Sequence, residues 1–122
     1  MKLFLALIFV FFVSFSPAFA IDLGFSSQVT TLATADVRQT VTAAVIKFPE
    51  LVIQNPASNT VSIFLGGSDV TTSGATQGIE IVPGGSIALT AEGRNNILLS
   101  SKFFIISTGT AIPVIIGRVT LN

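Results

Sequence analysis

Hydrophobic and polar positions alternate over short stretches of the chain after residue 20, and this period of two predicts β-strands. The first clear case is the segment of residues 37–45. Gln39 interrupts its apolar face, so the part of the strand that faces inward begins at Val41. The apolar side chains that share this face are those of Val37, Val41, Ala43 and Val45. The pattern predicts a strand over this segment.

Two further strands are expected over residues 51–55 and 61–65. Pro56 ends the first, because a residue without an N–H cannot continue a strand ladder. Residues 57–59 lie between the two segments as a turn, and the spacing predicts that they form a hairpin. Residues 66–78 follow as a loop rich in turn-forming residues, and within it residues 70–71 are compatible with a short strand.

The rest of the chain reads as strands joined by turns. Pro83 and Gly84 occupy the two central positions of a type II turn between residues 79–82 and 87–89. The continuous apolar runs at 103–106 and 112–116 predict central strands covered on both faces. Pro113 then has to face a sheet edge or a bulge, since it cannot donate to a neighbour.

The residue types support an all-β fold. After residue 20, 36 of 102 residues are Val, Ile or Thr, which favour strands, and no long amphipathic helix is visible. We predict a single antiparallel β-sandwich over residues 36–122, jelly-roll or Ig-like, with about seven to nine short strands. Residues 21–35 form either the first strand of this domain or an arm that adds to a neighbouring subunit's sheet.

Residues 1–20 differ from the rest. They hold sixteen hydrophobic residues and one charge, Lys2, and end in the small-residue pattern Ala18-Phe19-Ala20. The unbroken apolar run, residues 3–13, would span about 16 Å as a helix, against a bilayer core of roughly 30 Å. We predict a signal peptide cleaved after Ala20, with an uncleaved anchor as the alternative. The product would be secreted, periplasmic or at the cell surface, without stable membrane insertion after cleavage.

The composition excludes several kinds of chemistry. The chain contains no Cys, His, Trp or Tyr, so disulfides, imidazole or thiolate metal sites and Cys or His catalysis are ruled out. Six basic residues balance six acidic ones and are scattered, which argues against nucleic-acid binding. Ser100 and Lys102 read as polar residues before a strand rather than a catalytic dyad, and nothing brings Asp69, Glu80 and Glu92 together. We therefore expect a protein that is not an enzyme and needs no cofactor.

Two polar loops are the candidate interaction sites. Their residues are Gly66, Gly67, Ser68, Asp69, Thr71 and Thr72 in the first loop, and Arg94, Asn95 and Asn96 in the second. Asp69 is the candidate ligand if the first loop binds calcium, although the alternating ligands of a calcium loop are absent. These loops leave open a second function, a secreted module that binds a small ligand or glycan, with calcium assisting through Asp69.

A set of short motifs resembles a known family. The chain reads Ile53-Gln54-Asn55-Pro56, then Val61 to Thr72 as VSIFLGGSDVTT, then Ile81 to Leu89 as IVPGGSIAL, then Ile105 to Ala111 as IISTGTA. This order, over about residues 50–117, resembles the small β-sandwich accessory proteins, decoration or fibre-associated, of tailed-phage particles. The resemblance implies a non-enzymatic module that packs with copies of itself or with a virion component. Because such phage proteins are usually assembled in the cytoplasm, the signal peptide leaves two alternatives, the same fold in an exported surface role or only a shared order of β-turns.

Overall fold

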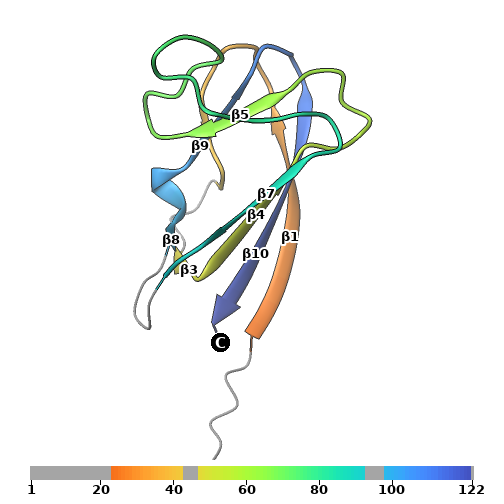
Figure 1. Ribbon diagram of the computed structural model, residues 1–122. Coiled ribbons are helices and arrows are strands. Elements are labelled where there is room, and N and C mark those ends of the chain that lie inside the picture. The colour runs from red at the N-terminus through yellow and green to blue at the C-terminus, as the bar shows by residue number, and fades with distance from the viewer. Residues whose placement is uncertain (1–22, 43–46, 93–97, 122) are drawn as a thin grey trace, which may run out of the picture.

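The computed structural model describes residues 23–42, 47–92 and 98–121, and the predicted signal peptide lies outside these ranges. The described residues form β-strands and one short 3-10 helix, η1 (Figure 1). In chain order the elements are β1 (Leu23–Leu32), β2 (Gln39–Thr40), β3 (Lys47–Phe48), β4 (Glu50–Gln54), β5 (Ile63–Gly66), β6 (Ile79–Ile81), β7 (Ser86–Thr90), β8 (Leu98–Leu99), η1 (Ser100–Lys102), β9 (Phe104–Ser107) and β10 (Ile112–Leu121).

The strands pair as one nested antiparallel ribbon that is rolled on itself. The outermost pair is β1 with β10, and the pairs β2–β9, β3–β8, β4–β7 and β5–β6 follow inward. Two further pairs, β10–β4 and β9–β5, close the roll. They produce sheet A, in the order β1-β10-β4-β7, and sheet B, in the order β2-β9-β5-β6. The predicted all-β antiparallel sandwich is confirmed, and the strand order is that of a jelly roll rather than an Ig-like fold.

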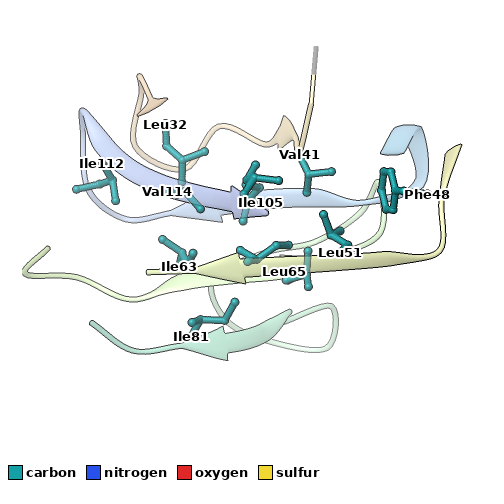
Figure 2. Packing of buried hydrophobic residues seen from close by; sticks show 12 residues of the cluster. Leu32, Val41, Phe48, Leu51, Ile63, Leu65, Ile81, Ile105, Ile112 and Val114 are labelled. Carbon is teal, nitrogen blue, oxygen red and sulfur yellow. The ribbon is translucent and has the colours of Figure 1, made fainter. Parts of the chain in front are cut away.

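The core lies between the two sheets, where side chains at every second strand position meet (Figure 2). Its fully buried members include Leu32, Leu51, Ile53, Val114 and Ile116 from sheet A, with Ile63, Leu65 and Ile105 from sheet B. Phe48 on β3 and Val41, which follows β2, are also buried members of this core. Each such side chain stabilises the fold by about 1.5–3 kcal/mol relative to an exposed position.

Residues 21–35 were expected to form either a first strand or an arm. Their described part is strand β1, which pairs with β10 of the same chain from Leu23↔Leu121 to Leu32↔Ile112. At ten residues, β1 and β10 are longer than the short strands predicted. The described part of the segment therefore belongs to the sheet of its own domain.

The strand predicted over residues 37–45 is much shorter than expected, since β2 contains only Gln39–Thr40 and residues 43–46 lie outside the described ranges. Val37 is 54% exposed rather than on an inner face. The reason is a turn at Asp36, which has a positive φ of 56° and donates its N–H to Ser107 O at 2.8 Å. The inner position begins at Val41, as the interruption at Gln39 indicated, and Val41 is fully buried.

The predicted hairpin over residues 51–65 is wrong, because β4 lies in sheet A and β5 in sheet B. Asn55, which is fully buried, redirects the chain between the two sheets. Its side-chain Nδ2 donates to Val61 O at 3.0 Å and to Ile81 O at 2.8 Å. Its backbone accepts from Gly84 N at 2.8 Å and donates to Gly85 O at 2.9 Å, in the turn after β6. One buried amide thus joins the β4–β5 crossover to the β6–β7 crossover.

That β6–β7 crossover is the type II turn that the sequence predicts. Gly84 has φ of 82°, and Gly85 N donates to Val82 O at 2.8 Å across the turn. The expected edge at Pro113 is also present, because the pairing of β4 with β10 begins only at Ile115. Asn59 lies beside Pro113 where β4 does not pair with β10. Its side-chain Nδ2 donates to Pro113 O at 2.8 Å and to Asn55 Oδ1 at 2.6 Å.

The two apolar runs near the C-terminus are central strands, as predicted, since β9 and β10 each have a neighbour on both sides. Only β9 is also covered on both faces. Ile105 faces the core and is buried, and Ile106 on the opposite face is 4% exposed. On β10 the core-facing residue Ile116 is buried, whereas Ile115 on the opposite face is partly exposed. The outer faces of the two sheets therefore differ.

Candidate functional site

The first predicted interaction loop folds back onto the outer face of sheet B. We call residues 67–78, which connect β5 to β6, the β5–β6 loop. Its Val70 is 1% exposed and packs with Phe64 and Ile106, which face away from the main core, and Phe104 packs against this small cluster. The pattern of turn-forming residues gave no sign of this second cluster. Val70 is an isolated apolar residue among polar ones, and that isolation was the available signal.

Two glycines make room for Val70. A Cβ placed on Gly66 would lie 2.7 Å from Val70 Cγ2, and one placed on Gly78 would lie 2.6 Å from the same atom. The Cβ on Gly78 would also lie 2.6 Å from Leu65 O, which is backbone and cannot move away easily. Gly66 precedes the loop and Gly78 is its last residue, so the two glycines let both ends of the loop pass close to Val70.

Hydrogen bonds within the β5–β6 loop centre on Thr71. Its N–H donates to Thr76 O at 3.0 Å and its carbonyl accepts from Gly78 N at 3.1 Å. Its hydroxyl lies 2.6 Å from Ser73 O and 3.0 Å from Thr76 Oγ1. Thr71 also forms an isolated bridge with Gln77, so one bridge residue stands where the sequence suggested a short strand at residues 70–71. Thr71 is therefore a scaffold residue of the loop.

Two residues outside the predicted sites contact the β5–β6 loop. Arg38 donates from Nη1 to Ser68 O. Thr72 donates from Oγ1 to Asp36 Oδ1 at 3.5 Å, which is at the long limit of a hydrogen bond. Asp36 and Arg38 belong to the turn before β2, and no local pattern joins that turn to residues about thirty positions away. Together with the exposed residues Ser68 and Asp69 and the half-buried Thr72, they form a polar surface.

The predicted loop residues are distributed as follows. Gly67, Ser68 and Asp69 are exposed, Thr71 and Thr72 are half-buried, and Gly66 is the last residue of β5. Arg94, Asn95 and Asn96 lie outside the described residues. Across the described ranges, no group of three or more acidic, Cys or His residues is placed to hold a metal ion, at Asp69 or elsewhere. The described residues therefore form no cluster of three carboxylates around the calcium candidate, Asp69.

The outer face of sheet A is the second surface with functional potential. Phe25 and Val29 on β1 are 69% and 66% exposed. The register places Phe25 beside Val119 and Val29 beside Ile115 on the same face of β10. The Phe25 ring lies above Gly117, where a Cβ would meet its Cζ at 3.0 Å. No pattern in the sequence marks this face as exposed, because an apolar residue in a strand is ordinarily assigned to the core.

Other candidate chemistry is not assembled in the part of the molecule that the structure describes. No pocket is present among these residues. Ser100 is buried at the start of η1, whereas Lys102 at its end is exposed. Glu80 accepts a hydrogen bond from Ser62 Oγ at 2.7 Å on an exposed surface. What the described residues offer to a partner is therefore open surface and strand edges.

Comparisons of the chain with protein-family models, with curated proteins and with solved structures found no match. Among the described residues, no helix has the length and apolar character needed to cross a membrane.

Proposed function

We propose that the protein is an exported, non-catalytic structural module that associates with copies of itself at a cell surface or on a particle, in the manner of a phage-virion surface protein. The observation that carries this proposal is the exposed apolar outer face of sheet A, with Phe25 and Val29 at more than 60% exposure. Large apolar side chains exposed on one face of a sheet are typical of interaction surfaces. The jelly roll supports the proposal, since capsid proteins use this architecture, although lectins use it as well.

Export rests on residues 1–20, with their short positive start, apolar run and Ala18-Phe19-Ala20. Expression of the full chain in a bacterial host, followed by mass spectrometry of the product outside the cytoplasm, tests it. A protein that begins at Ile21 is expected. A product that remains in the cytoplasm with residues 1–20 attached contradicts the export proposal.

Self-association is tested on this exported product by size-exclusion chromatography with light scattering over a hundredfold range of concentration. We expect a mass that rises with concentration to a dimer or a larger assembly, with electron microscopy showing whether filaments form. A mass that stays at one chain up to millimolar concentration, without filaments, contradicts the proposal.

Glycan binding is the second candidate, and the polar surface formed by Asp36, Arg38, Ser68, Asp69 and Thr72 favours it. Side-chain carboxylates, a guanidinium and hydroxyls can all hydrogen-bond to sugar hydroxyls. A glycan array probed with and without calcium tests this function. Binding that an Asp69→Asn change weakens only in the presence of calcium supports it, whereas no binding under either condition contradicts it.

A further inference from the structure

Among the described strands, β1 forms an open edge of its sheet. It forms one side of sheet A and extends over ten residues, LGFSSQVTTL, with no charged residue and no proline (Figure 1). Proteins normally protect sheet edges with short strands, charges, proline or bulges, because an open edge pairs with other chains. Sheet B follows that rule, since its edge strands β2 and β6 contain two and three residues. In β1 none of these protections is present.

The register identifies which backbone groups of β1 point outward. The N–H and C=O of one strand residue point to the same side, and the side alternates along the strand. Pro113 O accepts from Asn59 on the side of β10 that faces away from β1. Its register partner Thr31 therefore directs its backbone groups away from β10. By alternation, Leu23, Phe25, Ser27 and Val29 also present their N–H and C=O groups at the open edge.

We propose that the protein forms a two-fold dimer in which β1 pairs antiparallel with β1 of a second copy. This inference rests on the proposed function, whose self-association it assigns to one edge. A two-fold axis at Ser27 places the two Ser27 residues opposite each other and sets Phe25 opposite Val29 of the second copy. Every outward-facing residue of β1 then has a partner, which no other register achieves. The two sheets A become one continuous eight-stranded sheet.

A second copy fits this edge for two reasons. A two-fold interface brings each residue close to the same patch of the other copy, so a charged edge would oppose like charges, and β1 has none. The pairing also sets an aromatic residue against a β-branched one on the outer face, which is a favourable cross-strand contact. Phe25 and Val29, exposed in the single chain, cover each other across the two copies.

Opposite charges at the two-fold axis test this arrangement. Ser27 is exposed, so Ser27→Lys and Ser27→Glu leave the fold of one chain intact, as circular dichroism and thermal melting will show. Each variant alone places like charges directly opposite and should dimerise at least about tenfold more weakly than the wild type in sedimentation experiments. An equimolar mixture of the two variants should recover the dimer. Unchanged association in the single variants, or no recovery in the mixture, overturns the proposal.

The other edge of sheet A supplies the matched control. Ala88 lies at the centre of β7 and is exposed, and its backbone groups point away from β4, because strand alternation directs those of Ile87 and Leu89 toward β4. Ala88→Lys and Ala88→Glu should leave dimerisation within about twofold of the wild type, the ordinary effect of a surface change. Weakening by the Ala88 variants instead of the Ser27 variants would assign assembly to β7 and overturn the proposal.

Hydrogen exchange of the unmodified protein provides a test that needs no variant. On raising the concentration from micromolar to millimolar, the amides of Phe25, Ser27, Val29 and Thr31 should exchange at least about tenfold more slowly. Slowing confined to β7, or to the β5–β6 loop, contradicts the β1 dimer. A chain that stays monomeric throughout contradicts the proposed function as well, whereas an assembly that the Ser27 variants leave unchanged contradicts only the choice of edge.

Discussion

The outer faces of sheets A and B carry comparable apolar side chains, but only the face of sheet B is covered within the described residues. On sheet B, Phe64 and Ile106 are buried beneath Val70 of the β5–β6 loop. On sheet A, Phe25 and Val29 stand exposed. The difference arises from the connections. Residues 67–78 are long enough to fold back over sheet B, whereas the β6–β7 turn next to sheet A contains only residues 82–85.

The apolar side chains of the two faces therefore contribute to different processes, folding of the single chain on sheet B and association on sheet A. Burial of Phe64 under the loop lowers the free energy of the single folded chain, since that area leaves water when the chain folds. The exposed area of Phe25 and Val29 contributes little to the single chain and leaves water only when another molecule covers it. Stability should therefore respond to changes on sheet B, and association should respond to changes on sheet A.

The largest contrast is expected between two phenylalanines. Phe64→Ala should lower the free energy of unfolding by about 3–5 kcal/mol, because it opens a cavity beneath Val70. Phe25→Ala should change it by less than about 0.5 kcal/mol, because the ring is exposed. Urea unfolding at a concentration where the chain is monomeric measures both. Equal losses for the two variants would show that the faces are not different in the way described.

A pair of glycines gives a smaller contrast. Gly78→Ala places a methyl group 2.6 Å from both Leu65 O and Val70 Cγ2, and should destabilise the protein by about 1–3 kcal/mol. Gly117→Ala is the control on sheet A, where the new Cβ meets Phe25 Cζ at 3.0 Å. The exposed Phe25 ring can turn aside, so this change should stay within about 0.5 kcal/mol. Thermal unfolding of both variants decides, and a larger loss for Gly117→Ala would mean that Phe25 is held firmly.

The sequence predicted those parts of the fold that depend on local chemistry. The β-branched segments predicted an all-β sandwich, and Pro83 with Gly84 predicted the type II turn, because both depend on neighbouring residues alone. The edge position at Pro113 followed from its missing N–H. Each of these inferences needed no knowledge of distant residues.

What the sequence did not predict depends on contacts between distant residues. The hairpin prediction over 51–65 was wrong because the side chain of Asn55 bonds to Ile81 O, 26 residues away. The burial of Val70 depends on Phe64 and Ile106 sharing an outer face, which requires the pairing of β5 with β9. The contact of Arg38 with the β5–β6 loop likewise joins segments thirty residues apart. A pattern with a period of two places a residue on a face, and it does not say which distant segment covers that face.

The smallest effect is expected at the polar contacts that join the β5–β6 loop to the turn before β2. Arg38→Ala removes the bond to Ser68 O at an exposed site and should cost about 0.5–1 kcal/mol. Thr72→Val removes a longer contact, 3.5 Å from Asp36, and should stay within about 0.5 kcal/mol. Hydrogen exchange at the Val70 and Thr71 amides measures how firmly the β5–β6 loop is held on sheet B. If Val70 holds the loop on sheet B, these amides stay protected in both variants and lose protection in Gly78→Ala. Loss of protection in Arg38→Ala as large as in Gly78→Ala would instead make the polar contacts the cause of the covered face.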